Sequence, residues 1–167
     1  EKFVLSNSHS ALALYVVLEY NGRRNAEEVY NHHGVHADYC EECYIDCSGG
    51  SLGNGLAISV GMALADRSKN TFCLISDGEM MEGSIFEALR IADEQKLTNL
   101  KIYLNANGWG AYKSINTDDL EKKIKAFGFP IEVRRTNVKD FPFLEGQKGH
   151  YITLNEETYQ QAMQNLL

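Results

Sequence analysis

The sequence predicts an α/β domain built on a doubly wound, mainly parallel β-sheet with helices on both faces. Short apolar runs at residues 71–75 and 100–104 are rich in strand-forming residues, as expected of buried parallel strands. Around them, longer segments carry apolar residues at three- and four-residue spacing, which is typical of helices. Strands that alternate with helices of this length imply crossover connections and hence a parallel sheet.

Periodicity and stop signals place the elements along the chain. The pattern predicts helices at 11–20, 26–32, 56–65, 82–94, 118–127 and 156–166, and strands at 71–75, 100–104 and 130–135. Asn21-Gly22 ends the first helix and Gly34 ends the second. The helix at 56–65 is rich in Ala, Ser and Gly, so we expect it to pack closely against another element.

Composition indicates one globular domain and gives no reason to propose a nucleic-acid or membrane partner. The 167 residues, 44% of them hydrophobic and 23% charged, suit a single domain with a sizeable core. A net charge of −7 gives no reason to propose nucleic acid or an anionic membrane as a partner. Neither a membrane span nor a signal peptide is visible, so we expect a cytoplasmic location.

Polar residues follow both predicted strands. Asp77-Gly78 comes after the first strand, and Asn107-Gly108 follows the second, with Asp77 and Asn107 30 residues apart. If the strands are parallel neighbours, both side chains emerge at their carboxyl ends, where open α/β sheets bind ligands. Carboxylate, amide and phosphate oxygens form the hard ligand set that Mg²⁺ prefers. Taken alone, each dipeptide is also ordinary turn punctuation.

The combination resembles the thiamine diphosphate motif of the transketolase family, in which Gly-Asp-Gly is followed about thirty residues later by Asn. Three more segments are similar to family signatures and occur in the same order: KFVLSNSHS at 2–10, HAD at 36–38, and GSLGNGL leading into VGMALA at 50–65. Weaker similarity continues toward the end of the chain, at residues 141–145 and at His150. The resemblance covers nearly the whole chain and implies the thiamine diphosphate-binding fold. Ser76 departs from the motif, where the family has Gly.

The resemblance implies a metal and diphosphate site. Asp77, Asn107 and the main-chain carbonyl of Trp109 would bind Mg²⁺, or Ca²⁺ or Mn²⁺ in its place. The amide of Gly78 would contact the diphosphate, and Asn107 would also contact the cofactor. Trp109 could instead be mainly a packing residue, because a backbone ligand constrains its side chain little.

Other implied roles concern the reacting end of the cofactor. His9 would lie beside the diphosphate and the reacting carbon, and His36 would face the cofactor or the sugar hydroxyls, so both are candidate catalytic residues. Gly50 and Leu52 would line the cofactor rings. His9 could instead cap the helix that follows it.

The resemblance also implies an incomplete catalyst. We expect residues 1–167 to form a single diphosphate-binding domain, trimmed at its N-terminus, without the pyrimidine-binding domain whose glutamate activates the cofactor. A partner chain would supply that half, as in split transketolases, within a homodimer or hetero-oligomer that covers apolar surface around Leu52, Met80 and Met81.

The implied reaction is transfer of a two-carbon ketol unit between sugar phosphates or related sugars. Two alternatives stay open at this point. One is a decarboxylating acyloin or deoxyketose-phosphate synthase subunit that starts from a 2-oxo acid. The other is a noncatalytic scaffold derived from this domain.

One cluster is not explained by the resemblance. His36, Cys40, Cys43 and Cys47 form H-x3-C-x2-C-x3-C, four soft ligands at a spacing that could hold zinc tetrahedrally. The preferred interpretation is reduced thiols in a cytosolic loop, since His36 has a competing role near the cofactor.

Overall fold

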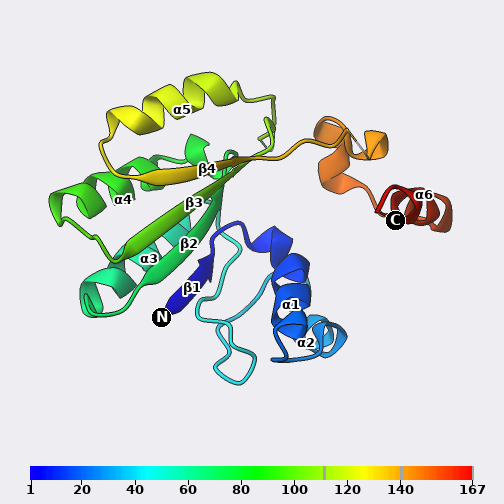
Figure 1. Cartoon of the computed structure of the whole chain (residues 1–167), viewed down its shortest axis with the longest axis horizontal. Coiled ribbons are helices and arrows are strands. Elements are labelled where there is room, and N and C mark those ends of the chain that lie inside the picture. Colours follow the sequence, from blue (N-terminus) through cyan, green and yellow to red (C-terminus); the bar gives the residue numbers. More distant parts are fainter. Residues whose placement is uncertain (111, 140, 167) are drawn as a thin grey trace.

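The computed structural model describes residues 1–110, 112–139 and 141–166. Its centre is a four-stranded sheet in the order β1-β2-β3-β4, and every neighbouring pair is parallel (Figure 1). The strands are β1 (Lys2–Leu5), β2 (Thr71–Ser76), β3 (Leu100–Ala106) and β4 (Ile131–Arg135). Cys73 on β2 pairs in register with Val4 and Ile102, so the strand centres align. The predicted parallel α/β class is confirmed.

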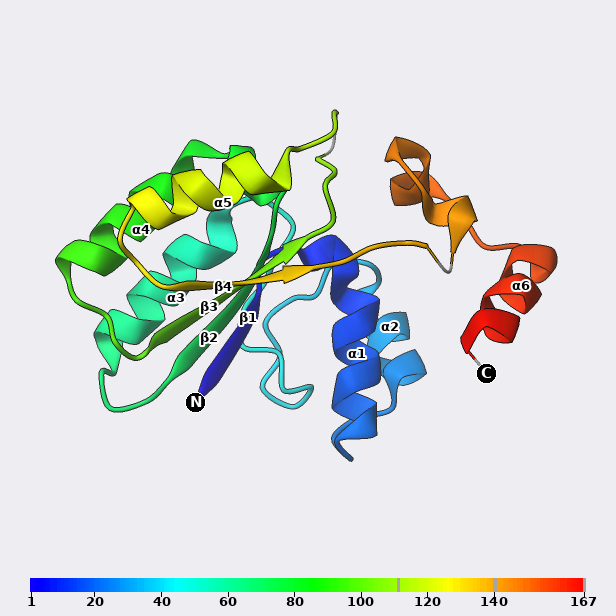
Figure 2. The same ribbon diagram turned by 45° about the horizontal axis from the view of Figure 1, so that its top comes forward.

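Helices lie on both sides of the sheet, but the crossover helices share one side. The helices α3 (Asn54–Ala65), α4 (Gly83–Glu94) and α5 (Thr117–Ala126) each join two successive strands. The order of these four strands never reverses, and crossovers are right-handed, so all three helices lie on the same face (Figure 2). The other side is occupied beside β1 by α1 (Ala11–Tyr20) and α2 (Ala26–His33). The second layer therefore comes from the N-terminal helix pair.

Two hydrophobic clusters reflect this arrangement. The larger one fills the space between the sheet and α3, α4 and α5, and includes Cys73, Ile75 and Leu104, all fully buried. The smaller one surrounds Tyr15 and joins α1, α2 and the segment that follows them. Val4 on β1 belongs to the first cluster and Leu5 packs against the second, because alternate residues of a strand face opposite sides. Strand β1 thus separates the two clusters.

Local signals set most helix ends close to the predicted positions. The side chain of Asn25 caps α2 by accepting from the Glu28 N–H, and Asn116 caps α5 in the same way from Asp119. The connection after β2 contains one element that the sequence did not predict. A short 3-10 helix, η2 (Glu79–Met81), follows β2, and α4 begins only at Gly83. The turn that meets the end of β2 is therefore η2, and α4 starts further from it.

The C-terminal part extends beyond the sheet. After β4 come two 3-10 helices, η3 (Pro142–Leu144) and η4 (Gln147–Tyr151), and then α6 (Glu156–Leu166), which stands apart from the strands (Figure 1). None of the helices within the described residues has the length and apolar character needed to cross a bilayer.

Candidate functional site

The carboxyl ends of β2 and β3 form the floor of a cavity of about 240 Å³. Asp77 follows β2, and Asn107 follows β3. Because Ser76 pairs in register with Asn105, both residues leave the sheet at the same edge. Six of the site residues predicted from the sequence line this cavity: His9, Leu52, Asp77, Gly78, Asn107 and Trp109. The parallel register therefore brings together groups that are up to 100 residues apart in the sequence.

Asp77 is the buried acid of this cavity. Its side chain is fully inaccessible, its Oδ1 accepts the Gly78 N–H at 3.0 Å, and its Oδ2 accepts the Gly108 N–H at 2.7 Å. Burial raises the pKa of the carboxyl group, and the backbone N–H groups partly oppose that rise. Each oxygen keeps a second lone pair, and a nearby cation would offset the cost of desolvating the charge.

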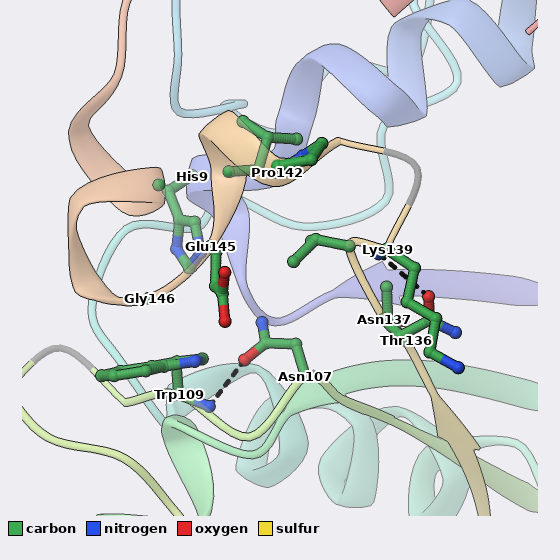
Figure 3. A pocket seen from close by; sticks show the side chains of 12 residues that line it. His9, Asn107, Trp109, Thr136, Asn137, Lys139, Pro142, Glu145 and Gly146 are labelled. Carbon is green, nitrogen blue, oxygen red and sulfur yellow. Dashed lines mark hydrogen bonds between the residues drawn. The ribbon is translucent and has the colours of Figure 1, made fainter. Parts of the chain in front are cut away.

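Asn107 and Trp109 supply further oxygens next to Asp77. The Asn107 Oδ1 accepts the Trp109 N–H at 2.8 Å, which fixes the orientation of the amide (Figure 3). The Trp109 carbonyl oxygen lies 3.8 Å from the position that a Cβ on Gly78 would take. A carboxylate, an amide oxygen and a main-chain carbonyl at one strand edge suit a hard divalent cation. The donor set therefore fits the magnesium site implied by the resemblance.

Asn7 is a polar residue of this cavity that sequence reasoning missed. It is buried, and its Oδ1 has no hydrogen-bond partner among the described residues, whereas its Nδ2 donates to Ser10 Oγ at 3.1 Å. Buried acceptors are rarely left unpaired, so a bound ligand is the natural partner for this oxygen. The only available signal was its place beside His9 in the N-terminal motif.

Glu79 is a second residue that was missed, and it holds the site together. Its fully buried carboxylate accepts the Ser6 hydroxyl at 2.5 Å and the Gly53 N–H at 3.0 Å through Oε1. Its Oε2 accepts the Ser76 N–H at 3.0 Å and the Ser76 hydroxyl at 3.3 Å. One side chain thus joins the ends of β1 and β2 to the N-terminus of α3. Nothing in the local sequence distinguishes this buried acid from a solvated one.

A larger cavity of about 590 Å³ adjoins the first and shares His9, Asn107 and Trp109 with it. Its other walls come from residues 136–139, after β4, and from the C-terminal segment that carries Glu145. Figure 3 shows the imidazole of His9 and the carboxylate of Glu145 directed into this space. His9 therefore faces both cavities.

His36 and Gly50 lie together and line neither cavity. The position of a Cβ on Gly50 would be 3.9 Å from the His36 ring, and both residues are exposed. Neither one lines the cavity that contains Asp77. Their contact with the cofactor stays a prediction.

The expected apolar surface near the site is partly wrong. Met80, the middle residue of η2, is fully buried and belongs to the larger hydrophobic cluster. Leu52 and Met81 are exposed, as expected of residues that a partner chain would cover.

The four residues that could have formed a zinc site, His36, Cys40, Cys43 and Cys47, do not come together. Cys47 packs against the larger cluster, and its Sγ donates to the Ser48 carbonyl at 3.0 Å. Among the described residues, the side chains that come together are those of His33, Cys40 and Cys43, so His36 and Cys47 lie outside the group. The helical geometry of α2 brings its last residue, His33, to the two sulfurs. All four cysteines are free thiols.

A parallel sheet with a polar cavity at its strand ends defines the chain as an open α/β domain of the ligand-binding class. The sequence profile of the transketolase thiamine diphosphate-binding domain matches residues 1–142. The chain therefore belongs to the transketolase family.

Individual relatives agree with this assignment. Transketolase from Homo sapiens is 33% identical over 168 residues, covering 92% of this chain and 27% of the human protein. The 6-deoxy-6-sulfo-D-fructose transketolase subunit SqwG from Clostridium sp. is 36% identical over 146 residues, covering 79% of this chain and 53% of that subunit.

Structural similarity points to the same fold. The crystal structure of transketolase from Campylobacter jejuni superimposes with a TM-score of 0.76 at 20% identity, covering the whole of this chain and 34% of the other. The chain thus spans about a quarter to a half of the length of the relatives that it matches.

Proposed function

We propose that the chain is the diphosphate-binding subunit of a transketolase-like enzyme and that a second chain completes its active site. The observation that carries this proposal is the convergence of Asp77, Asn107 and the Trp109 carbonyl at the ends of two adjacent parallel strands. The reaction is transfer of a two-carbon ketol unit from a ketose phosphate, or a related ketose such as a 6-sulfonated one, to an aldose.

The metal and the diphosphate are held by the floor of the smaller cavity. Asp77, Asn107 and the Trp109 carbonyl bind Mg²⁺, which offsets the desolvation of the Asp77 carboxylate. The N–H of Gly78 and the unpaired Oδ1 of Asn7 contact the bound group. When bound, thiamine diphosphate supplies an electron sink for the carbanion that carbon–carbon bond cleavage produces.

His9 is the proton-transferring residue of the proposal. It lines both the cavity that contains Asp77 and the larger one beside it, so its imidazole can contact a sugar hydroxyl next to the bound cofactor. Glu145 is directed into the same space and can accept hydrogen bonds from sugar hydroxyls (Figure 3). These residues orient the sugar and move its protons, while the partner chain provides the group that activates the cofactor.

Exposed apolar side chains support assembly with a partner. On α1, Leu12, Val16 and Val17 are each more than half exposed, and Leu52 at the smaller cavity and Met81 in η2 are exposed as well. Apolar surface of this kind marks interaction sites on soluble domains. The proposed partner is the pyrimidine-binding half of the enzyme.

Calorimetric titration tests the proposal. Thiamine diphosphate with Mg²⁺ is titrated into the chain alone and into its mixture with a pyrimidine-domain subunit encoded nearby. We expect binding that requires the partner and that weakens more than about 100-fold in Asp77→Ala, because loss of even an outer-sphere partner costs 10- to 100-fold. The matched control is Asp93→Ala, which removes an exposed carboxylate on α4 and should bind as the unmodified chain does.

Activity of the reconstituted pair identifies the reaction. Ketose phosphates and a sulfonated ketose are compared with pyruvate as donors. Turnover of pyruvate alone would assign a decarboxylating synthase. No cofactor binding in any mixture would leave a noncatalytic scaffold.

A further inference from the structure

A second group of chemically reactive side chains lies in the segment between α2 and α3. A ring nitrogen of His33 and the Sγ atoms of Cys40 and Cys43 all lie within 4.8 Å of one another, and all three residues are partly buried. His33 is the last residue of α2, and the two cysteines enclose a short turn. None of them lines either of the cavities described above.

The turn between Cys40 and Cys43 brings their two sulfurs close to each other. The Cys43 N–H donates to Cys40 Sγ at 3.2 Å, and Cys40 and Ile45 exchange two backbone hydrogen bonds of 3.0 and 2.9 Å. Hydrogen bonds to ligand atoms are the usual outer-shell support of metal sites. Tyr44 has a φ of 60°, a left-handed conformation that is rare for an aromatic residue and that marks a locally strained turn.

Contacts from the connection between α1 and α2 hold this strained turn in place. The guanidinium of Arg23 lies 4.8 Å from the centre of the Tyr44 ring, and Arg24 Nε donates to the Glu42 carbonyl at 3.0 Å. The turn is therefore fixed against the helix pair before any ligand arrives, which lowers the entropic cost of bringing ligands together.

His33 gives an independent indication of a missing partner. Its Nε2 is buried and has no hydrogen-bond partner among the described residues. Buried imidazole nitrogens are normally paired, and neutral imidazole is the commonest metal ligand in proteins. The neighbouring His32 presents its ring edge-on at 4.5 Å and so packs against His33 instead of satisfying it.

We propose that His33, Cys40 and Cys43 bind a zinc ion, with water as the fourth ligand. Two thiolates and an imidazole are ligands that zinc accepts in tetrahedral sites. Zinc–ligand bonds of about 2.0–2.3 Å place neighbouring ligand atoms roughly 3.5–3.8 Å apart. The present separations, all within 4.8 Å, need only small side-chain rotations to close onto an ion.

The ion clamps the segment that leads toward the candidate active site. It links the end of α2 to the turn at residues 40–43, and Ala37 lies between these two anchors. Ala37 accepts a hydrogen bond from the Gly49 N–H at 3.0 Å, which positions His36 beside Gly50. An ion that binds only the folded segment stabilises it in proportion to its occupancy.

Zinc binding to the whole chain, purified under reducing conditions, tests the proposal. Zn²⁺ is titrated in competition with a chromophoric chelator, and Co²⁺ is used as a spectroscopic probe of thiolate ligation. We expect one zinc per chain and a sulfur-to-cobalt charge-transfer band. Cys40→Ser, Cys43→Ser and His33→Gln should each weaken zinc binding by more than about 100-fold, since loss of an outer-shell partner alone costs 10- to 100-fold.

Matched controls come from neighbouring residues of the same types. Cys47→Ser and His32→Gln should retain zinc affinity, because neither residue belongs to the converging group. Circular dichroism reports whether each variant is folded, and addition of Zn²⁺ to the unmodified chain should raise its thermal midpoint whatever the variants do.

Three results would overturn the zinc site: an unmodified chain that binds no zinc, equal weakening by Cys47→Ser, or a Cys40–Cys43 disulfide in place of two metal-bound thiolates. The experiment uses neither thiamine diphosphate nor a partner chain. Its failure is therefore separate from failure of the proposed function.

Discussion

Glu79 offers the sharpest test of how the strand ends are held together. The change Glu79→Gln keeps the size and shape of the side chain and replaces one carboxylate oxygen by an amide nitrogen. In either orientation of the amide, that nitrogen faces a backbone N–H, from Gly53 on one side or from Ser76 on the other. The Ser6 and Ser76 hydroxyls can rotate to accept from the amide, but a backbone N–H cannot.

The expected cost therefore comes from one backbone donor that loses a charged acceptor in a buried site. Hydrogen bonds to charged groups contribute about 1.5–3 kcal/mol, so Glu79→Gln should lower the free energy of unfolding by about that amount. Glu79→Ala strands both backbone donors and should cost roughly twice as much.

Urea denaturation of the whole chain, followed by circular dichroism, measures the change. Glu82→Gln is the matched control: Glu82 is exposed and lies just after the same turn, so we expect a change within about 0.5 kcal/mol. A Glu79→Gln variant as stable as this control would refute the argument that the carboxylate ties β1, β2 and α3 together.

Three other predictions concern stability and pH. Gly55→Ala should destabilise the chain by about 1–3 kcal/mol, because its Cβ would lie 2.6 Å from the Cα of Ser6, whereas Gly61→Ala in the same helix meets nothing within 4 Å and should stabilise by up to about 1 kcal/mol. Equal effects in denaturation curves would contradict the predicted clash. Leu104→Ala on β3 should cost about 2–5 kcal/mol by the same assay, since the side chain is fully buried, and a smaller cost would mean that the core collapses around it. Asp66 has a folded-state pKa lowered from 3.8 to about 2 by Ser68 and Lys69, so its stabilising effect is complete above about pH 4 and is lost toward pH 2. Asp66→Asn should be less stable than the unmodified chain at pH 7 and equally stable near pH 2, and a constant difference across that range would refute the assignment.

Much of the fold was accessible from the sequence because it depends on local patterns. The runs at 71–75 and 100–104 are strands, and the stop signals at Gly34 and Asn21-Gly22 end helices as expected. Residues that each follow a strand could be placed together without a structure, since parallel strands end at the same edge of a sheet. That argument brought Asp77 next to Asn107.

Residues whose role depends on distant packing could not be found this way. Glu79 is buried where it accepts hydrogen bonds from Ser6 and Gly53, two residues that are distant from it in the sequence. The spacing of hydrophobic residues carries no information about such contacts. Asn7 becomes a buried acceptor of the cavity for the same reason. Met80 was predicted to lie on the surface, but as part of the 3-10 helix η2 its side chain is buried in the core.

The sequence by itself determined the parallel α/β class, the family and the placement of the residues that follow each strand, because hydrophobic spacing and motif order are written along the chain. Only the tertiary structure decided which polar groups converge across elements. It brought His33, and not His36, to Cys40 and Cys43, and it packed Cys47 against the larger hydrophobic cluster. The physical reason is that such contacts depend on how helix ends and loops pack in the tertiary structure, which sequence spacing alone does not specify.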